Sequence, residues 1–595
     1  MRGLAALVAA ALLAGCAGRT AAPIAGGAAG PVAGGAAGPV AGAAAGPVEV
    51  HVIAFNDFHG NLEPPKLSID VAGADGKPVA APAGGAAYLA SAIAGLRAQA
   101  AHSITVSAGD MTGASPIVSS LFLDEPTIAA MNLIGVDLNA AGNHEFDRGI
   151  DELRRLQNGG CAKTGNGEPC RLDRFAGARF AYLAGNTIEA SGHSAFPATA
   201  IREFRDGARV VKIGFIGLTT RTTTTLVNPA GIPGIRFADE ADTANAQIAG
   251  LRAGGADAIV LLIHEGGAAE GGPNDCTALS GAIRPILDRL DTRVDLVVSG
   301  HTHRSYICGY AAYDPARPFL LTSAGRYGTL VTDAVLAIDP ATHRVVGKRA
   351  RNIVVQNEGY VGADGKTVAP SDLTMRYAPE PRVGGLVARY TAAAAPLASK
   401  PVGLLTGPLV KAKEGGGMTE TALGNLIADS QLAATRVSGA QIALMNPYGI
   451  RTSLNPAPDG SITYADLYAV QPFGNTLMVR AYTGAQVRAV LEQQIDRKIV
   501  MSVAGMTYAY DRSRPAGSRI MDARVGTAPL DDAATYRVTV NNFLAFGGDG
   551  FSTLTAGRDV AGGPSDLDAL VAHLATGKPV GPPATGRIVD RTPVR

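Results

Sequence analysis

The chain has 595 residues, too many for one hydrophobic core, and this length predicts two or three domains. Apolar residues make up 47% of it, so each domain can bury a substantial core. The formal net charge is only +1, and charged residues make up 17%, which argues against a surface for nucleic acids. We therefore expect no nucleic acid polymer as a partner, and any ligand specificity must arise in a pocket.

Residues 1–16 predict an export signal that ends in a lipobox. Arg2 precedes an apolar run over residues 4–13, which is too short to span a bilayer, and small residues then lead to Cys16. We predict a lipoprotein signal peptide with lipidation at Cys16. An ordinary signal peptide that is cut nearby is the alternative.

The residue after Cys16 bears on the location of the mature protein. It is alanine, which by resemblance to Gram-negative lipoproteins favours the outer membrane. The expected protein is thus periplasmic or in the cell envelope, and it contacts the membrane only through a lipid anchor.

Residues 17–47 form the next segment, which contains an Ala/Gly/Pro repeat. Residues 33–40 copy residues 25–32 exactly, and residues 41–48 are a near copy. Because Gly-Pro recurs in every copy, no helix can form, and no residue of the repeat can build a core. The repeat predicts a disordered tether.

From residue 48 to about residue 353, short apolar runs alternate with helical stretches. The expected strands cover residues 50–55, 103–108, 135–141, 258–263 and 294–298, and the expected helices cover residues 86–100, 126–134 and 238–254. Such alternation predicts βαβ layering. By itself it does not distinguish a four-layer sandwich from a doubly wound sheet.

Each of these expected strands runs into a polar cluster. Together the clusters supply seven O and N donors without a thiolate: Asp57, His59, Asp110, Asn143, His264, His301 and His303. Five of the ten histidines of the chain fall in these clusters, namely the four just listed and His144, which follows Asn143. Since the ends of the strands of an α/β sheet share one edge, the donors should meet there. This set favours two divalent ions with a bridging carboxylate over a thiolate zinc site.

The sequence motifs of these clusters resemble those of a known family. Asp-x-His, Gly-Asp, Gly-Asn-His-Glu, His-Glu and Gly-His-x-His occur in the order of the calcineurin-like metallophosphoesterases. Three longer motifs are similar to those of the secreted bacterial 5′-nucleotidases: Phe-Asn-Asp-Phe-His-Gly, Gly-Asn-His-Glu-Phe-Asp and Ser-Gly-His-Thr-His. The relatives of these enzymes include UDP-sugar hydrolases and 2′,3′-cyclic phosphodiesterases. The resemblance runs from about residue 48 to the C-terminus.

This resemblance implies a fold of class α/β. An N-terminal four-layer αββα sandwich over residues 48–353 would be joined by a linker and connecting helix, residues 354–400, to a smaller α+β nucleotide-binding domain over residues 401–595. The Ala-rich connecting helix is expected over residues 381–400. In the second domain we expect helices over residues 421–434 and 484–494 and strands over residues 441–445 and 536–541.

The resemblance also assigns the metal ligands. Asp57, His59 and His303 would hold one ion, Asn143, His264 and His301 the other, and Asp110 would bridge them. The ions would be of the Zn, Mn, Co or Fe class and would activate a water nucleophile. His144 would stabilise the transition state or protonate the leaving oxygen, with its tautomer fixed by Asp147. Alternatively, Asp147 only caps a helix over residues 148–157.

Four cysteines remain after Cys16: Cys161, Cys170, Cys276 and Cys308. An even number of cysteines in an exported protein predicts disulfides, with three possible pairings. Proximity in the sequence favours Cys161–Cys170 and Cys276–Cys308. The second pair would brace two loops that carry metal ligands.

The second domain has no cluster of metal ligands, so we expect it to recognise the substrate across an interdomain cleft. By resemblance, Asn446, Arg451, Phe473, Phe543 and Asp549 line a nucleoside pocket. The two phenylalanines would sandwich a base, Arg451 would bind phosphate or carboxylate, and Asp549 would accept from ribose hydroxyls.

The chain departs from the family at two places in this domain. No arginine precedes the word Glu-x-x-Leu-Gly-Asn, and Pro447-Tyr448 replaces the glycines expected before Arg451. These departures leave the hydrolytic chemistry intact and bear on which nucleotide is preferred.

The sequence therefore predicts a monomeric two-metal phosphohydrolase. It would release phosphate from extracytoplasmic nucleotides, with UDP-sugars and 2′,3′-cyclic nucleotides as further substrates. The alternatives are a sulfur-oxidation hydrolase of the same superfamily, which the aromatic pair argues against, and a non-catalytic surface binding lipoprotein, which the full ligand set argues against.

Overall fold

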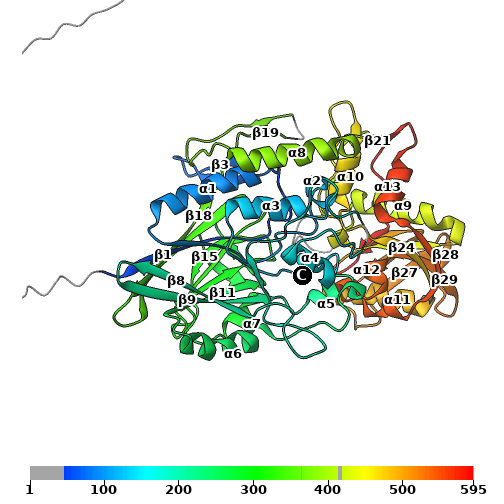
Figure 1. Cartoon of the computed structure of the whole chain (residues 1–595). Helices are drawn as coiled ribbons and strands as arrows, with labels where there is room; N and C mark the ends of the chain where they lie inside the picture. Colours follow the sequence, from blue (N-terminus) through cyan, green and yellow to red (C-terminus); the bar gives the residue numbers. More distant parts are fainter. Residues whose placement is uncertain (1–45, 166, 363–364, 413–418, 594–595) are drawn as a thin grey trace, which may run out of the picture. The chain divides into compact units, whose positions relative to one another are not determined.

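Two six-stranded sheets lie face to face in the first part of the computed structural model (Figure 1). The structure describes residues 46–165, 167–362, 365–412 and 419–593. The predicted signal peptide, its Cys16 and nearly all of the predicted tether lie outside these ranges. No helix in the described part of the chain is both long and apolar enough to span a membrane.

The first sheet carries three of the predicted ligand-bearing strands side by side. Its order is β18 (Arg344–Val354), β17 (Leu330–Asp339), β1 (Val48–Phe55), β4 (Ser103–Ser107), β5 (Leu138–Ala140) and β6 (Ala181–Leu183). Strands β1, β4, β5 and β6 pair in parallel, so their carboxyl ends share one edge. The predicted ligands that follow β1, β4 and β5 are therefore brought to a common place.

The second sheet repeats this arrangement. Its order is β15 (Ser305–Gly309), β16 (Leu320–Ala324), β14 (Leu296–Ser299), β11 (Ala258–His264), β9 (Arg209–Thr219) and β8 (Thr199–Asp206). Strands β9, β11, β14 and β16 pair in parallel with one another, while the edge strands β8 and β15 are antiparallel. All seven residues of β11 are buried, as expected for a parallel strand covered on both faces.

The space between the sheets is filled by one apolar core that includes Val52, Val106, Val260 and Leu296. Helices α1 (Ala86–Gln99) and α3 (Glu125–Ile134) pack on the outer face of the first sheet, while α6 (Glu240–Ala253) and α7 (Ile283–Leu287) cover the second (Figure 1). This is the four-layer αββα sandwich, and the doubly wound alternative is wrong.

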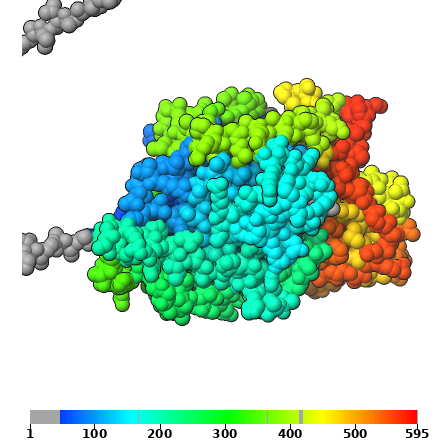
Figure 2. All heavy atoms as spheres, viewed as in Figure 1, coloured from blue at the N-terminus to red at the C-terminus, as the bar shows by residue number. Residues whose placement is uncertain are grey.

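Helix α8 (Pro381–Ala398) is the predicted connecting helix. It lies against α1, α2 (Ile117–Ser120) and α3, and the space-filling view shows its yellow-green segment over the blue atoms of the first helices (Figure 2). Glu380 caps its N-terminus by accepting from the backbone of Val383 at 2.7 Å. Because buried residues of α8 belong to the hydrophobic core of the first domain, the connecting helix is packed firmly against that domain.

A five-stranded sheet forms the centre of the second domain. Its order is β25 (Ser502–Ala504), β22 (Ile442–Met445), β29 (Thr535–Asn541), β24 (Thr476–Thr483) and β30 (Arg558–Ser565). Alternate residues of β22 face opposite cores, with Ala443 toward α9 (Ala422–Thr435) and α13 (Asp566–Leu574). Leu444 faces the core of α11 (Gly484–Arg497) on the other side.

Smaller elements complete the chain. A three-stranded sheet has the order β23 (Ser461–Thr463), β21 (Pro401–Leu405) and β31 (Pro579–Val580). A four-stranded sheet has the order β28 (Ala528–Pro529), β27 (Ile520–Val525), β26 (Met506–Tyr510) and β32 (Ile588–Asp590). Two-stranded pairs join β2 (Ser68–Ala72) to β3 (Pro78–Pro82), β7 (Thr187–Ile188) to β10 (Arg236–Phe237), β12 (Ala268–Glu270) to β13 (Thr277–Ser280), and β19 (Tyr360–Val361) to β20 (Thr367–Val368). The remaining α-helices are α4 (Ile150–Asn158), α5 (Thr223–Leu226), α10 (Tyr464–Val470) and α12 (Asn542–Ala545).

One predicted strand is shorter than expected. The apolar run over residues 135–141 contains β5 only from Leu138 to Ala140. Gly135 instead ends α3 in a left-handed conformation with φ 79°, and the N–H of Val136 donates to the carbonyl of Met131. The residues that look like the start of a strand thus belong to the C-terminal cap of a helix.

The structure contains two disulfides, Cys161–Cys170 and Cys276–Cys308. This is the pairing favoured by proximity in the sequence. Cys276 lies in the loop after His264, and Cys308 lies in β15, which follows His303. Two disulfides in one chain indicate an oxidising, extracytoplasmic compartment.

Candidate active site

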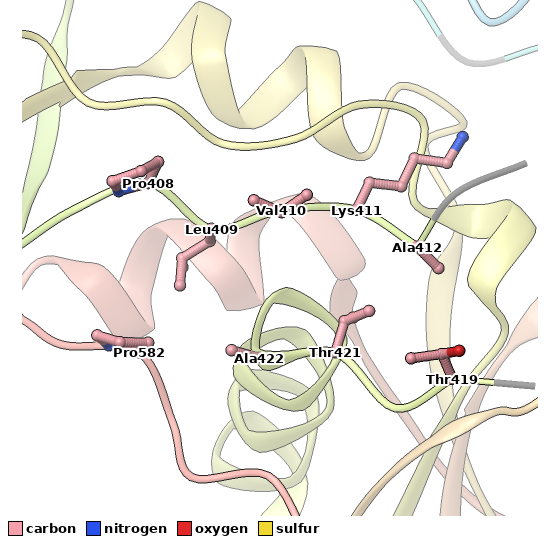
Figure 3. A pocket seen from close by; sticks show the side chains of 9 residues that line it. All are labelled: Pro408, Leu409, Val410, Lys411, Ala412, Thr419, Thr421, Ala422 and Pro582. Carbon is pink, nitrogen blue, oxygen red and sulfur yellow. The ribbon is translucent and has the colours of Figure 1, made fainter. Parts of the chain in front are cut away.

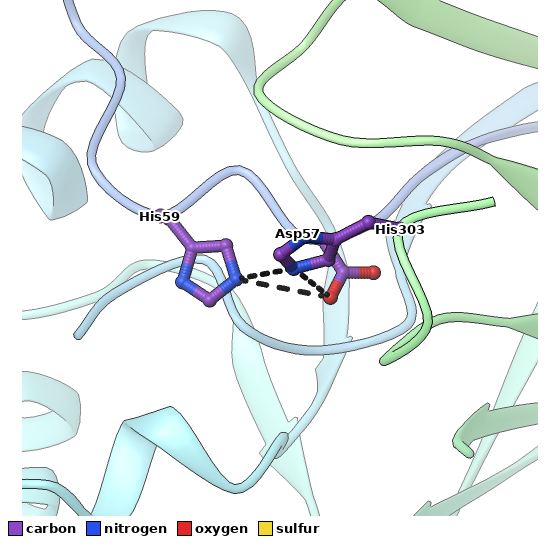
Figure 4. Close-up of side chains that lie close together, drawn as sticks. All are labelled: Asp57, His59 and His303. Atoms are coloured by element: carbon purple, nitrogen blue, oxygen red, sulfur yellow. Dashed lines mark hydrogen bonds and ion pairs between the residues drawn. The ribbon is translucent and has the colours of Figure 1, made fainter. Parts of the chain in front are cut away.

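Asp57, His59 and His303 form one cluster at the common edge of the two sheets (Figure 4). The Nε2 atoms of His59 and His303 are 3.1 Å apart, and the Oδ1 atom of Asp57 lies 3.3 Å from Nε2 of His303 and 3.8 Å from that of His59. Asp57 and His59 have no exposed surface. One carboxylate and two imidazoles from loops of both sheets thus converge with their donor atoms within 3.8 Å of one another.

A second cluster joins Asp110, His264 and His301. The Oδ2 atom of Asp110 lies 3.0 Å from Nε2 of His264 and 3.5 Å from Nε2 of His59 in the first cluster. The carboxylate of Asp110 therefore reaches one ring nitrogen of each cluster, which is the position that a bridging ligand must have.

Hydrogen bonds to backbone carbonyls set the tautomers of two histidines. Nδ1 of His59 lies 2.9 Å from the carbonyl of Gly113, and Nδ1 of His264 lies 2.7 Å from that of Ala108. A carbonyl can only accept, so both Nδ1 atoms carry the proton and both Nε2 atoms present a lone pair to the cluster. Backbone orientation of this kind is typical of metal-binding histidines.

Among the predicted metal ligands, two buried polar atoms have no hydrogen-bond partner in the described structure, Oδ1 of Asn143 and Nε2 of His264. Such orphaned atoms are costly in a protein interior unless a ligand satisfies them. A carboxylate, amide and imidazole donor set without thiolates fits two divalent ions of the Zn, Mn, Co or Fe class. The residues present therefore fit a two-metal centre.

Five of the seven predicted ligands have a left-handed backbone conformation. The φ angles are 49° for Asp57, 47° for His59, 53° for Asp110, 73° for His301 and 58° for His303. This region is sparsely populated for residues with a side chain, and each such residue carries conformational strain. The tight turns after the strands are thus held in the geometry that makes the donors converge.

Glu145 holds the loop that carries Asp110. Its carboxylate accepts from the backbone N–H groups of Asp110, Met111 and Gly142 at 2.8, 2.8 and 2.6 Å, and from Thr112 at 3.3 Å. Burial, followed by the negative charge of Asp110, raises the pKa of Glu145 to about 7. The sequence contained this residue inside Gly-Asn-His-Glu, but the motif alone gave it no role.

Other residues that the sequence did not single out also position the donors. Asn56 donates from Nδ2 to the carboxylate of Asp57 at 2.7 Å and to the carbonyl of Gly325 at 2.8 Å. The backbone N–H of His301 donates to both oxygens of Asp57. The ring of Tyr327 lies 5.9 Å from that of His59 and 5.7 Å from that of His303.

Electrostatics separates His264 from the other histidines of the two clusters, since burial also lowers the pKa of His301. Burial, reinforced by the positive charge of Arg451, lowers the pKa of His59 to about 3, and burial likewise lowers the pKa of His303 to about 4. For His264, burial is outweighed by the charge of Asp110, and the pKa rises to about 10. Of the four cluster histidines, His264 alone is therefore stabilised as a cation, and a metal ion would compete there with a proton.

His144 and Asp147 lie beside the clusters and contact each other. Nδ1 of His144 lies 3.0 and 2.9 Å from the two carboxylate oxygens of Asp147, whose Oδ2 atom also accepts from the N–H of Ala114. Helix α4 begins only at Ile150, and its N-cap Gly149 makes no side-chain cap. The alternative that Asp147 only caps this helix is therefore wrong.

Arg451 of the second domain lies close to this site. Its positive charge contributes to the lowered pKa values of His59 and His303, and it opposes the raised pKa of His144. Its Nε and Nη2 atoms are buried without a hydrogen-bond partner in the described structure. These two N–H groups point in the same direction and form the edge of the guanidinium that matches a phosphate or carboxylate in a bidentate contact.

Of the other predicted pocket residues, Phe473 contacts the metal-binding domain, while Asn446, Phe543 and Asp549 lie together in the second domain. Phe473 lies on the metal side, where its ring stacks on that of His144 at 5.8 Å with an interplanar angle of 19°. Nδ2 of Asn446 donates to Asp549 at 2.7 Å, and Oδ1 of Asn446 accepts from Asn541 at 3.1 Å. The ring of Phe543 lies against Gly548, in the loop that also carries Asp549.

A cavity of about 470 Å³ lies apart from the metal ligands (Figure 3). It is lined by Pro408, Leu409, Val410, Lys411, Ala412, Thr419, Thr421, Ala422 and Pro582. Among these, Lys411 donates to the backbone carbonyl of Arg451 at 3.2 Å. The cavity contains none of the predicted site residues, and its edge adjoins residues 413–418, which lie outside the described part of the chain.

Comparison with known proteins agrees with this geometry. A calcineurin-like phosphoesterase family model matches residues 50–305, and a 5′-nucleotidase C-terminal domain model matches residues 402–556. The chain is 30% identical over 566 residues to a cell wall protein of Listeria monocytogenes, with 90% of this chain and 68% of that protein covered.

Two further relatives span the same regions. The chain is 30% identical over 550 residues to Endonuclease YhcR of Bacillus subtilis, and although 91% of this chain is aligned, it spans only 41% of that protein. A solved 5′-nucleotidase precursor from Thermus thermophilus superposes with a TM-score of 0.70 at 28% identity, over 91% of this chain and 99% of the other. The chain belongs to the calcineurin-like metallophosphoesterases with a 5′-nucleotidase C-terminal domain and is a metal-dependent phosphoesterase of the 5′-nucleotidase type.

Proposed function

We propose that this protein hydrolyses phosphate esters of extracytoplasmic nucleotides, with 5′-nucleotides as its main substrates and UDP-sugars or 2′,3′-cyclic nucleotides as further ones. The observation that carries the proposal is the position of Asp110, whose Oδ2 atom lies 3.0 Å from His264 and 3.5 Å from His59. A carboxylate between two nitrogen-rich clusters is the arrangement of a two-metal hydrolase.

The seven predicted ligands would hold the metals as two sets. Asp57, His59 and His303 would bind one ion, Asn143, His264 and His301 the other, and Asp110 would contact both. When bound, the ions would supply Lewis-acid activation of a water nucleophile and neutralise charge on the phosphoryl oxygens.

His144 would donate a proton to the leaving group, and Asp147 would hold His144 in the orientation for it. Burial disfavours the charged imidazole, but the nearby charges of Asp147 and Asp110 raise the pKa of His144 above its ordinary value. With Nδ1 engaged by Asp147, Nε2 remains for an oxygen of the substrate. His144 is thus suited to donate a proton to the leaving oxygen or to stabilise the charge on it.

The second domain would bind the rest of the nucleotide. Arg451 presents an unpaired bidentate edge suited to a phosphate, and Phe473 offers a ring beside His144. Phe543 would complete the sandwich around the base, while Asn446 and Asp549 would contact the ribose hydroxyls. Membership of a 5′-nucleotidase family supports nucleotides as the substrate class.

The location follows from the same reasoning. The two disulfides indicate an extracytoplasmic protein. The lipobox residue Cys16 supports a periplasmic protein that is lipid-anchored to the outer membrane, with the anchor as its only membrane contact.

The test is product release by purified, metal-stripped protein with and without added Mn²⁺ or Zn²⁺. The substrates are AMP, UDP-glucose, 2′,3′-cyclic AMP and bis-p-nitrophenyl phosphate, and Asp110→Asn is measured in parallel. Turnover of a nucleotide that needs the metal and disappears in the variant is expected. Asp242→Asn, a substitution of an exposed aspartate, is the matched control and should retain activity.

Failure of every substrate with every metal would refute the proposal. Turnover of AMP without metal, or full activity in the Asp110→Asn protein, would refute the two-metal mechanism while leaving the nucleotide specificity intact.

A further inference from the structure

The loop that carries Asp549, residues 547–550, is bordered by three side chains for which the proposed function has no use. They are Arg497 at the end of α11, Tyr448 in the loop after β22, and Phe546 after α12. We propose that they form an accessory site for a group attached to the 3′ oxygen of the substrate ribose, so that 5′-phosphorylated dinucleotides are substrates. This inference rests on the proposed function, because it takes Asp549 as the residue at the ribose.

Arg497 supplies a cation at this loop. A side chain at Gly550 would begin 2.1–2.2 Å from Cζ, Nη1 and Nη2 of Arg497, so the guanidinium lies directly on the backbone next to Asp549. The charge of Arg497 also lowers the pKa of Asp549, which burial raises. The guanidinium is therefore close to the carboxylate proposed to contact the ribose.

Arg497 is available for a ligand. It is exposed, and none of the carboxylates in the described ranges forms an ion pair with it. Its neighbour Asp496 is instead bonded by Nη1 of Arg519 at 2.6 Å. An exposed guanidinium beside the sugar position is suited to a phosphodiester oxygen.

Two exposed aromatic rings flank the same loop. Tyr448 is 61% exposed and Phe546 is 46% exposed, and they are the only aromatic residues among the exposed large apolar side chains in the part of the chain that the structure describes. Single exposed apolar residues are common on protein surfaces. Two rings beside one proposed substrate loop, in a chain without tryptophan, instead indicate a stacking surface.

Tyr448 is tied to the site by its place in the turn Pro447–Gly449 that follows β22. Asn446, the residue that begins this turn, donates from Nδ2 to the carboxylate of Asp549 at 2.7 Å.

The placement of the nucleotide explains why a 3′ extension would meet these groups. With the 5′-phosphate at the metal clusters and the base between Phe473 and Phe543, the proposed function puts the ribose hydroxyls at Asp549. A phosphodiester on the 3′ oxygen would leave the pocket beside Arg497, and the following base would meet Tyr448 or Phe546. A cation followed by aromatic rings is the usual combination for single-stranded nucleotides.

The reaction on such a substrate is the same hydrolysis. Water attacks the terminal phosphorus, the bond between phosphorus and the 5′ oxygen breaks, and the leaving oxygen takes a proton. The products are inorganic phosphate and the dinucleoside monophosphate, whose internal phosphodiester stays intact.

The experiment compares AMP with 5′-phosphorylated adenylyl-(3′→5′)-adenosine. Arg497→Gln is expected to lower the ratio of kcat/KM for the dinucleotide to kcat/KM for AMP about tenfold, the usual effect of losing one charge-assisted contact. Tyr448→Ala and Phe546→Ala should lower the same ratio, and Tyr448→Phe should preserve it. Arg488→Gln is the matched control, because Arg488 lies on the same helix and pairs with Asp532.

Salt dependence gives a second readout. Raising the ionic strength should weaken binding of the dinucleotide more than binding of AMP, and this difference should shrink in the Arg497→Gln protein. The binding of both compounds to metal-stripped protein is measured in the same way, so the inference is tested whether or not turnover occurs.

The outcomes separate the two proposals. No turnover of AMP or of any other substrate with any metal would refute the proposed function, while binding of the dinucleotide that depends on Arg497 would still support the accessory site. Turnover of AMP with the same substrate ratio in the wild-type, Arg497→Gln and Tyr448→Ala proteins would overturn the accessory site and leave the nucleotidase standing.

Discussion

The carboxylate of Glu145 accepts the backbone N–H of Asp110 at 2.8 Å, so the acid that follows His144 in the sequence holds the turn of the proposed bridging ligand. The same carboxylate also accepts from Met111, Thr112 and Gly142. Four N–H donors converging on one buried group keep the left-handed turn at Asp110 in place. Glu145 is thus a positioning residue that acts through Asp110.

Replacing Glu145 should weaken metal binding. In Glu145→Gln one acceptor oxygen becomes an amide N–H₂ that faces backbone N–H groups, so the turn at Asp110 loses part of its support. We expect metal affinity to fall roughly 10- to 100-fold, as for other residues that orient a ligand. Titration of metal-stripped protein with Mn²⁺ or Zn²⁺ measures this, and Glu270→Gln, an exposed acid in β12, is the control. Unchanged affinity would contradict the positioning role.

Replacing Asp147 should affect catalysis without removing the metals. Asp147→Asn leaves the geometry near His144 but removes the negative charge that raises its pKa. His144 then loses its proton at a lower pH, so the alkaline limb of the kcat profile should move to lower pH, and kcat should fall about 100-fold. Metal content, measured by elemental analysis, should not change. A profile of unchanged shape would show that His144 does not act as an acid.

Removing the two disulfides separately should have different consequences. The Cys276–Cys308 bridge closes a segment of 32 residues and the Cys161–Cys170 bridge one of 9, so chain entropy predicts losses of about 4 and about 3 kcal/mol respectively. Only the Cys276–Cys308 bridge joins the loop after His264 to the strand after His303. The double variant Cys276→Ser/Cys308→Ser should therefore also lose metal affinity, and Cys161→Ser/Cys170→Ser serves as its matched control. Equal metal affinities would refute the bracing role.

Asp566 should make stability depend on pH. It is fully buried at the start of α13, where its backbone N–H donates to the carbonyl of Asn475, in the loop of Phe473. Burial raises its pKa from 3.8 to about 7, although a hydrogen bond from Asn475 opposes the shift. Between pH 4 and pH 7 the unfolded chain has lost this proton while the folded protein retains it. The folded state therefore loses stability as the pH rises through this window.

Asp566→Asn should remove this dependence. Relative to the wild-type protein, the variant should gain on the order of a few kcal/mol between pH 4 and pH 7.5. Thermal unfolding at several pH values measures the change in Tm, and Asp568→Asn, an exposed acid in the same helical turn, is the control. A parallel pH dependence in the two variants would show that Asp566 is ionised in the folded protein at neutral pH.

The sequence by itself determined the parts of this protein that depend on local order. Apolar runs predicted β1, β4, β11 and β14, and the polar residues directly after them predicted the seven donors, because the ends of parallel strands meet at one sheet edge. The disulfide pairing also followed from short separations along the chain. For the same reason the capped end of α3 was mistaken for the start of a strand, since Gly135, Val136 and Asp137 extend an apolar pattern.

Only the tertiary structure decided the relations between residues that are distant along the chain. The role of Glu145 depends on a turn 35 residues earlier, and the stack of Phe473 on His144 joins two domains. Arg497 meets Gly550 because α11 packs beside the loop of Asp549. No local pattern encodes such contacts, because they depend on how side chains fill the space between packed elements, and that packing is fixed only when the whole chain has folded.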